Sequence, residues 1–270
     1  MRLLALDLDG TSLEDGGTLG EENREALLRA RRAGWTVCFV TGRREVDMRP
    51  LGDLSRWADY LLLNNGGKLI RTADGAVLRN ILINGRDGLA LAEGCLEHGW
   101  QLYAVSGRRW WVNWTTPSGR AYAESLGVQP ISYSRAEELP WRELEGFMIT
   151  RDARRVSDWI IAQGLELEVL FSEPDTADVM QQGVCKLSGV RVLAGLLGCT
   201  LDETVAVGNY TNDLDMILGA GVGVAVRDAL EEVRRAADYV TRRDHNHGAV
   251  AEVVERFVLS QSAGCCKTER

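Results

Sequence analysis

Two aspartates, Asp7 and Asp9, stand one residue apart at the end of the apolar run 3–6, and Gly10 follows them directly. In an extended strand alternate side chains lie on the same face, so the two carboxylates share a face. Carboxylates held close together with little solvent repel each other and favour a bound cation, and Mg²⁺ suits such a pair together with a phosphate. The pair therefore indicates a Mg²⁺ site or, alternatively, a strand that ends in a solvated acidic turn.

Two further segments carry groups that bind anions. Thr41 and Gly42 follow the apolar run 35–40, and there a hydroxyl can donate to an anion while a glycine lets backbone N–H groups approach it. Lys186 begins a predicted helix, at a position where the helix dipole favours an anion over a cation. A phosphate that faces both the lysine and the helix end removes this conflict. Taken singly, the two segments also fit a capping threonine and a surface lysine.

A fourth polar segment follows Gly208, at the end of another apolar run. Either of its carboxylates alone is explained by capping or by the charge preference of a helix N-terminus. Polar residues at three strand ends, together with a lysine at a helix start, are harder to explain separately. One phosphate-and-metal site accounts for all four segments. The polar residues of this last segment are Asn209, Asn212, Asp213 and Asp215.

The elements that must position these residues alternate between strand and helix at both ends of the chain. Such alternation predicts a parallel sheet with right-handed crossovers, and nearly continuous apolar strands fit a sheet covered on both faces. Open sheets of this kind bind ligands at the carboxyl ends of their strands. We predict strands at 2–7, 35–40, 59–64, 204–209, 221–226 and 238–241, and helices at 21–33, near 44–56, and at 187–198, 212–219, 228–236 and 248–259.

The middle of the chain, residues 84–183, has a different pattern. Its strand candidates 109–115 and 165–172 alternate apolar and polar residues, as half-exposed antiparallel strands do. It also holds six of the eight tryptophans, for most of which we expect a core role: Trp100, Trp110, Trp111, Trp114, Trp141 and Trp159. At 270 residues the chain is long for one core. We therefore predict an α/β fold with a doubly wound, mostly parallel core, residues 1–83 plus 184–270, and an inserted α/β domain, residues 84–183.

Composition excludes several classes of partner. The formal net charge of −8 argues against a nucleic-acid binder, and no apolar run is long enough for a membrane span, so we expect a cytoplasmic protein. Four cysteines are scattered singly, as reduced core cysteines are, and the pair Cys265 and Cys266 lies in a polar tail. His245 and His247 form an H-x-H pair that could bind a transition metal, but a surface loop is the simpler interpretation.

The motifs "DLDGT", "TGR", a single lysine and "GNYTNDLDM", in this order, resemble the four motifs of the haloacid dehalogenase (HAD) superfamily. The insertion and the ending "ADYVT…HGAVAEVVERF" resemble its Cof-type phosphatase branch, which has a large α/β cap. The resemblance covers nearly the whole chain. It implies a Rossmann-like core with the catalytic site and a cap domain that closes over this site and selects the substrate.

The resemblance also implies roles for individual residues. Asp7 matches the nucleophile that forms an aspartyl phosphate, and Asp9 matches the general acid and base, whose backbone carbonyl also binds Mg²⁺. Thr41, Gly42, Lys186 and Asn212 match the groups that bind phosphate. The implied metal residues are Asp7, Asp9, Asn209 and Asp213. The family usually has aspartate where Asn209 stands, so we expect weaker Mg²⁺ binding with the chemistry retained, and Asp213 or Asp215 could compensate.

These observations together predict a Mg²⁺-dependent phosphatase that hydrolyses a small phosphorylated metabolite, such as a sugar phosphate. Two alternatives stay open: a phosphomutase that returns the phosphoryl group to a sugar, and a catalytically silent binding protein, which Asn209 suggests. The substrate and the oligomeric state are not specified by the sequence. Candidate substrate contacts in the inserted domain are Arg108, Asn113 and Arg120.

Overall fold

The computed structural model describes residues 2–54, 56–173 and 175–260. Their contacts divide the chain into two compact units. The first unit comprises the described residues of Met1–Thr41, Asp53–Leu78 and Cys185–Arg270, and the second comprises those of Gly42–Gly52 and Arg79–Val184. The pair Cys265 and Cys266, singled out in the sequence, lies outside the described residues.

The first unit is built on a predominantly parallel sheet, which confirms the predicted fold class. Its strand order is β14-β13-β12-β1-β2-β3-β4-β5, so β1 lies inside the sheet with parallel neighbours β12 and β2. The antiparallel strand β4 and the edge strand β5 were not predicted. The strands are β1 (Arg2–Leu6), β2 (Trp35–Val40), β3 (Tyr60–Leu63), β4 (Lys68–Arg71), β5 (Val77–Asn80), β12 (Thr204–Gly208), β13 (Val222–Ala225) and β14 (Tyr239–Val240).

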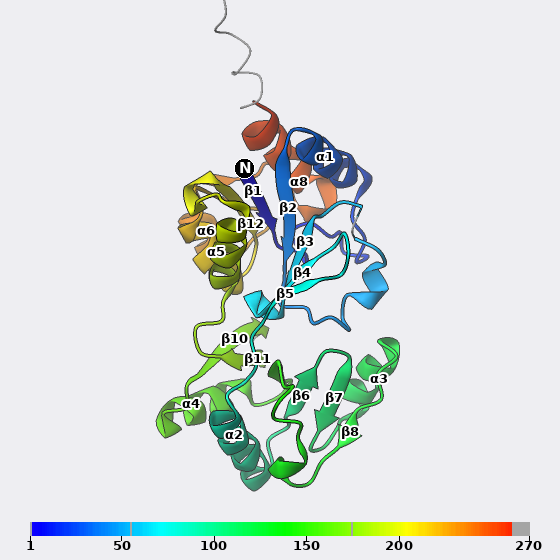
Figure 1. The fold of residues 1–270 in the computed structure, drawn as a ribbon, viewed down its shortest axis with the longest axis vertical. Coiled ribbons are helices and arrows are strands. Elements are labelled where there is room, and N and C mark those ends of the chain that lie inside the picture. Colours follow the sequence, from blue (N-terminus) through cyan, green and yellow to red (C-terminus); the bar gives the residue numbers. More distant parts are fainter. Residues whose placement is uncertain (1, 55, 174, 261–270) are drawn as a thin grey trace, which may run out of the picture. The chain divides into compact units, whose positions relative to one another are not determined.

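Helices cover both faces of this sheet, with α5 and α6 on one side and α1 on the other (Figure 1). Alternation along β1 explains the packing: Leu3 and Ala5 join a cluster with Val190 and Leu193 of α5, while Leu4 is buried outside that cluster. The helices are α1 (Glu21–Arg32), α5 (Lys186–Leu197), α6 (Leu214–Gly219), α7 (Glu231–Ala236) and α8 (Ala249–Val253), which continues as a π-helix over Val254–Leu259.

The helix predicted near 44–56 is wrong. Among the described residues of this range, only a short 3₁₀ turn, η1 (Arg49–Leu51), forms, and Pro50 and the left-handed Gly52 prevent its extension. The segment 42–52 instead packs with the second unit, where Val46 is fully buried. Val46 thus serves a core formed by residues distant in sequence.

The second unit contains a six-stranded sheet of order β10-β11-β9-β6-β7-β8. The antiparallel pairing predicted for its strands is present except between β7 and β8, which run parallel. The strands are β6 (Tyr103–Ser106), β7 (Arg109–Val112), β8 (Ile131–Ser132), β9 (Gly146–Ile149), β10 (Leu167–Glu173) and β11 (Thr176–Gln181), and the helices are α2 (Gly85–His98), α3 (Pro117–Ser125) and α4 (Ala153–Gln163).

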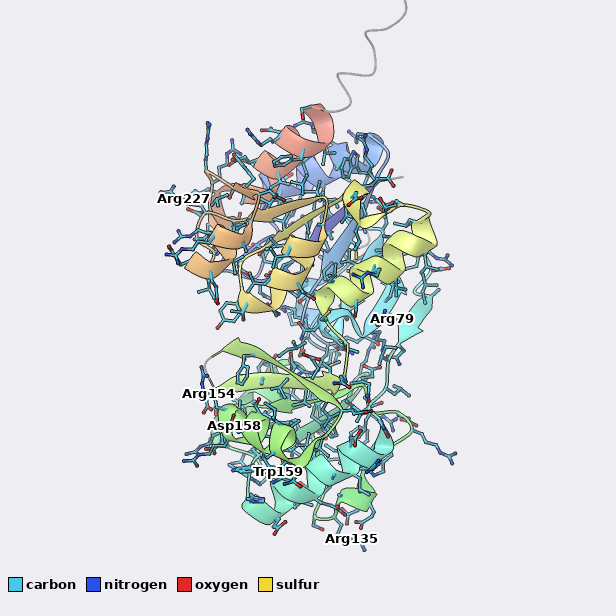
Figure 2. The ribbon with its side chains drawn as sticks, turned by 90° about the vertical axis from the view of Figure 1, so that its left-hand side faces the viewer. Arg79, Arg135, Arg154, Asp158, Trp159 and Arg227 are labelled. Atoms are coloured by element: carbon cyan, nitrogen blue, oxygen red, sulfur yellow. The ribbon has the colours of Figure 1, made fainter. Side chains whose placement is uncertain are left out.

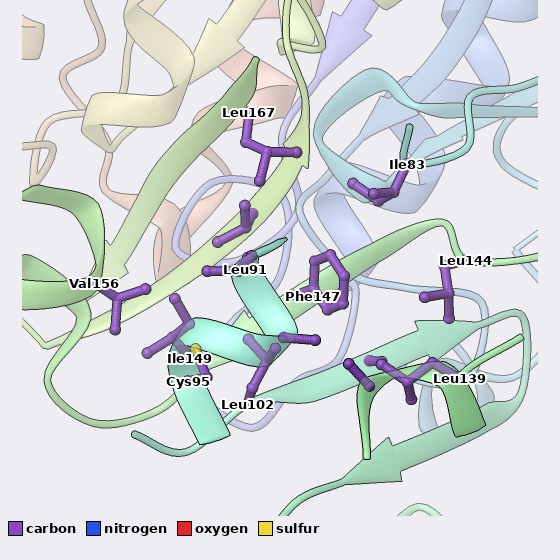
Figure 3. Close-up of a cluster of buried hydrophobic side chains, with 14 of the residues drawn as sticks. Ile83, Leu91, Cys95, Leu102, Leu139, Leu144, Phe147, Ile149, Val156 and Leu167 are labelled. Carbon is purple, nitrogen blue, oxygen red and sulfur yellow. The ribbon is translucent and has the colours of Figure 1, made fainter. Parts of the chain in front are cut away.

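Both faces of β6, β7 and β9 are buried, so the half-exposed arrangement expected for 109–115 is wrong, whereas residues 168–171 of β10 are partly exposed as expected. On one face, Phe147 and Ile149 pack with Leu91 of α2 and Val156 of α4 (Figure 3). The opposite face carries Tyr103, Val105, Trp110, Val112 and Met148, which pack with Ala123 of α3 and Val46. The layer on this opposite face is formed by α3 together with the segment 42–52, whose sequence gave no sign of joining this unit.

Most tryptophans of the second unit have the core role expected of them. Trp110 and Trp111 are buried on opposite faces of β7. Trp159 of α4, labelled in Figure 2, contacts the rings of His98 and Trp100 edge-on and packs against the core. Trp114, by contrast, is exposed.

Candidate active site

Three neighbouring strand ends bring the predicted site residues to one edge of the first unit's sheet. Leu6 of β1 is in register with Phe39 of β2 and with Val207 of β12. Asp7 therefore leaves β1 beside the ends of both neighbours, and its N–H still donates to the Val207 carbonyl at 2.9 Å. Thr41 and Asn209 lie one residue beyond the ends of β2 and β12. Parallel pairing thus gathers residues that are far apart in sequence.

Lys186 joins two carboxylates at the centre of this edge. Its Nζ donates to Asp7 Oδ1 at 2.7 Å and to Asp213 Oδ1 at 2.5 Å. All three side chains are buried, with 1% of the lysine side chain, 7% of the Asp7 side chain and none of the Asp213 side chain exposed. The lysine begins α5 as predicted, and its placement against the helix dipole is offset by two anionic partners. When the lysine and both carboxylates are ionised, this buried triad has a net charge of minus one.

The triad shifts the pKa values of two of its members. Burial and the nearby Asp213 carboxylate raise the pKa of Asp7 above its ordinary value, although Lys186 opposes the change. Burial disfavours the charged form of Lys186, but the Asp213 and Asp7 carboxylates outweigh it and raise the pKa of the lysine. Lys186 therefore stays cationic, and it supplies the positive charge that Asp7 needs to ionise.

The two oxygens of the Asp213 carboxylate have different partners. Oδ1 accepts from Lys186, and Oδ2 accepts from the backbone N–H groups of Asn209 and Tyr210 at 2.8 and 3.0 Å. A Cβ at Gly208 would lie 2.4 Å from the Asp213 carboxyl carbon, so only glycine leaves room for it. Asp213 thus holds the lysine and the turn after β12 together.

Asp9 differs from Asp7 in its environment. Its side chain is exposed, whereas Asp7 is buried. The N–H groups of Thr11, Ser12 and Leu13 all donate to the Leu8 carbonyl and close a tight loop that contains Asp9. The glycine in this loop, Gly10, is left-handed at φ 67°. Two neighbouring carboxyl groups in such different environments can take different roles in a reaction.

The residues at this edge fit a magnesium ion of the kind that binds one or two carboxylates and a substrate phosphate. Asp7 offers a carboxylate, and a Cβ at Gly10 would lie 2.4 Å from Asn209 Nδ2, so the Asn209 amide lies against the loop that carries Asp9. Within 2–54, 56–173 and 175–260, no three His, Cys, Asp or Glu side chains form a cluster that could hold a metal ion by themselves. The donor set therefore fits a site completed by amide or carbonyl oxygens and by substrate.

Asp215 has a local role. Its Oδ2 accepts from the N–H of Leu187 at 3.0 Å, in the first turn of α5. The first N–H groups of a helix lack partners within the helix, so this carboxylate satisfies one of them and ties α6 to α5 beside Lys186. The other oxygen, Oδ1, accepts from the backbone N–H of Met216 at 2.7 Å, so each oxygen of the carboxylate has a backbone partner.

Asn65 is a residue of this site that the sequence analysis missed. It lies in the turn η2 (Asn64–Gly66) after β3, donates its N–H to the Thr41 carbonyl at 3.0 Å, and accepts from Asn212 Nδ2 at 3.1 Å. The run "NNGG", residues 64–67, was the available signal, because it marks one more polar strand end where the predicted strand 59–64 stops.

Other candidate residues lie in the second unit. Gly42 begins its segment 42–52. Asn113 uses its side chain on backbone groups, accepting from Leu102 and Trp114 and donating to Trp100, which is a structural role. Arg108 is exposed and pairs with Glu45 at 3.1 Å, and Arg120 lies exposed on α3.

His245 and His247 behave differently from each other. His247 is exposed and pairs with Asp244. Both ring nitrogens of His245 form hydrogen bonds, one to Asp228 and the other to Asp15 at 2.9 Å. Two carboxylates therefore flank this ring, and the sequence had not connected either of them with it. In the ranges that the structure describes, no helix combines the length and apolarity needed to cross a membrane.

A doubly wound α/β unit with a buried carboxylate–lysine triad at its strand ends defines a class of protein suited to phosphate chemistry. The comparison with protein families is consistent with this geometry: the model for haloacid dehalogenase-like hydrolases matches residues 4–254. The chain therefore belongs to the haloacid dehalogenase-like hydrolases, as the four sequence motifs had predicted.

Individual relatives agree with this assignment over nearly their full length. The chain is 28% identical over 260 residues to the 5-amino-6-(5-phospho-D-ribitylamino)uracil phosphatase YcsE of Bacillus subtilis, covering 96% of each chain. It is 27% identical to the phosphoglycolate phosphatase of Methanothermobacter thermautotrophicus, covering 96% of this chain and 99% of that protein. A solved haloacid dehalogenase-like hydrolase from Bacteroides thetaiotaomicron has a TM-score of 0.81 at 26% identity, covering 94% and 98% of the two chains. The chain is a phosphoric monoester hydrolase of this family.

Proposed function

We propose that the protein is a Mg²⁺-dependent phosphatase of a small phosphorylated metabolite that works through an aspartyl phosphate on Asp7. The observation that carries the proposal is the buried Asp7 carboxylate, 2.7 Å from the Lys186 ammonium at the carboxyl end of β1. A buried carboxylate beside a fixed cation is equipped to attack phosphorus, because the cation favours its ionised form and attracts the anionic substrate.

In the first step an Asp7 oxygen attacks phosphorus, and the bond from phosphorus to the leaving oxygen breaks. Asp9 gives its proton to that oxygen, so the alcohol leaves neutral. In the second step Asp9 takes a proton from water, the water oxygen bonds to phosphorus, and the bond from Asp7 to phosphorus breaks. Inorganic phosphate leaves and both aspartates return to their starting states. The accessibility of Asp9 supports its exchange of protons with solvent.

Lys186, Thr41 and Asn212 are assigned to the phosphate, with Gly42 as a further backbone donor. The metal residues are Asp7, the Asp9 carbonyl, Asn209 and Asp213, and the partners of Asp213 Oδ1 and Oδ2 suggest that it acts chiefly by orienting Lys186 and Asn209. A bound Mg²⁺ neutralises charge on the transferred phosphoryl group. We assign the choice of substrate to the second unit, as the cap. The named substrates of the relatives, a phosphorylated ribitylaminouracil and phosphoglycolate, favour a small phosphorylated metabolite.

The test is a hydrolysis screen over phosphorylated sugars, nucleotides and small acids, run with Mg²⁺ and with EDTA. We expect phosphate release that requires Mg²⁺ and is lost in Asp7→Asn. The same screen distinguishes the alternatives, because a phosphomutase would yield an isomeric sugar phosphate without releasing phosphate. Turnover that persists in Asp7→Asn would refute the mechanism.

A further inference from the structure

The turn η2, which follows β3, holds an unusual backbone conformation. Asn64 and Asn65 have φ of 53° and 50°, and in the described ranges only Asp152 shares a positive φ among non-glycine residues. Both asparagines are buried, with 4% and 2% of their surface exposed. Left-handed residues other than glycine are strained, and they persist where surrounding contacts hold them, often at functional sites.

The contacts of Asn65 connect two phosphate-binding segments of the proposed site. Its backbone N–H donates to the carbonyl of Thr41, and its side-chain Oδ1 accepts from Nδ2 of Asn212. An asparagine side chain carries a donor on one arm and an acceptor on the other. The hydrogen bond from Asn212 Nδ2 to Asn65 Oδ1 holds the Asn212 amide in one orientation.

The same turn packs against a third segment. A Cβ at Gly66, whose φ is 100°, would lie 2.3 Å from the carbonyl oxygen of Cys185, the residue before Lys186. The turn therefore contacts the start of α5 through backbone alone. Asn65 and Gly66 together meet the segments of Thr41, Lys186 and Asn212, which come from three separate parts of the chain.

We propose that Asn65 is a positioning residue for phosphate binding, acting through the side chain of Asn212 and the backbone of Thr41. This inference rests on the proposed function, since it concerns the phosphate site of that reaction. Asn65 makes both contacts from its left-handed conformation. Removing the Asn65 side chain frees the Asn212 amide to rotate. It should therefore weaken the binding both of the substrate's phosphate group and of the product, inorganic phosphate.

The experiment compares wild type with Asn65→Gly, Asn212→Ala and the double variant. Glycine adopts the left-handed conformation without strain, so Asn65→Gly removes the side chain and keeps the backbone contact to Thr41. The measurements are Mg²⁺-supported hydrolysis of p-nitrophenyl phosphate and the inhibition constant of orthophosphate. We expect Asn65→Gly to raise that constant about three- to tenfold, the effect of one lost hydrogen bond. The double variant should show no further increase beyond Asn212→Ala.

Asp152→Gly is the matched control, because it relieves the same left-handed strain at φ 59° in the second unit. Its inhibition constant should equal that of wild type. An unchanged inhibition constant in Asn65→Gly, or additive effects in the double variant, would overturn the inference while leaving the phosphatase assignment intact. A wild-type protein that neither hydrolyses the ester nor binds orthophosphate would refute the proposed function itself, and the inference with it.

Discussion

At the scale of single residues, the site depends on placing like charges together. Asp7 and Asp213 share one lysine in a buried setting, and the pKa of Asp7 is raised by burial and by its neighbour. Such an arrangement lowers stability and is kept where chemistry needs it. The cost of ionising Asp7 should therefore be measurable.

We expect Asp7→Asn to be more stable than wild type at neutral pH in EDTA, by roughly 1–2 kcal/mol. A carboxyl group whose pKa is raised in the folded protein lowers the protein's stability as the pH rises. The loss begins near the pKa of the unfolded chain, about 3.8, and is complete above the pKa of the folded protein. The difference between the two proteins should thus be small at pH 4 and larger at pH 8. Urea denaturation across this range measures it, and a variant less stable than wild type at pH 8 would contradict the account.

Asn209 supplies a second prediction at this scale. Replacing its amide by a carboxylate adds a charge beside Gly10, so Asn209→Asp should lower the Mg²⁺ concentration for half-maximal activity, on the order of tenfold. Asn212→Asp is the control, since it adds the same charge at a residue assigned to phosphate. Equal Mg²⁺ dependence in Asn209→Asp and wild type would show that the amide is neutral for metal binding.

At the scale of elements, the close approach of α5 and the turn η2 keeps Lys186 in place. A Cβ at Gly189 would lie 2.5 Å from Leu62 Cδ2 and 2.9 Å from Gly66 Cα, whereas a Cβ at Gly195 on the same helix meets nothing within 4 Å. The two glycines therefore form a matched pair within one helix.

Gly189→Ala should destabilise the protein by about 1–3 kcal/mol through overpacking, and it should lower activity by displacing Lys186. Gly195→Ala should instead stabilise it by about 0.5–1 kcal/mol, because alanine is the better helix former. Thermal denaturation and p-nitrophenyl phosphate turnover measure both. A Gly189→Ala protein as stable as Gly195→Ala would show that the contact with η2 is not tight.

His245 links three segments of the first unit. Partial burial opposes its charge, but hydrogen bonds to Asp15 and Asp228 outweigh this and raise the pKa of His245. A histidine with a raised native pKa contributes stability that is complete below its unfolded value, near 6.5, and is lost as pH rises through its native value. His245→Gln should therefore reduce stability at pH 6, by at most about 1 kcal/mol, and have less effect at pH 9.

His247→Gln is the control for this prediction, because 76% of the His247 side chain is exposed. It should change stability little at either pH. A His245→Gln effect that grows with pH would contradict the assignment of an imidazolium between the two aspartates.

At the scale of the whole molecule, much of the first unit was predictable. Apolar runs ending in Asp7, Thr41 and Gly208 marked parallel strands, and parallel pairing requires their ends to meet. Asp7, Lys186 and Asp213 were expected at one site, and the structure brings their side chains together. Its hydrogen bonds did not, because the partners of Asp213 depend on the turn that Gly208 permits.

What escaped prediction was decided by contacts between residues far apart in sequence. Arg44 is buried between Asp47 and Asp178, and this pairing draws segment 42–52 into the second unit instead of a helix. The role of Asn65 likewise depends on Asn212, 147 residues away. Periodicity describes neighbours along the chain, so it carries no information about such partners.

The central claim is that Asp7 carries the phosphoryl group during turnover. The direct measurement is mass spectrometry of peptides from acid-quenched protein after brief reaction with p-nitrophenyl phosphate and Mg²⁺. Asp9→Asn should be used beside wild type, since this leaving group needs little acid catalysis while hydrolysis of the intermediate still needs the Asp9 base. We predict a phosphoryl group on Asp7 that accumulates in Asp9→Asn and is absent in Asp7→Asn. Phosphate release by wild type, with no phosphoryl group on Asp7 in either wild type or Asp9→Asn, would contradict it.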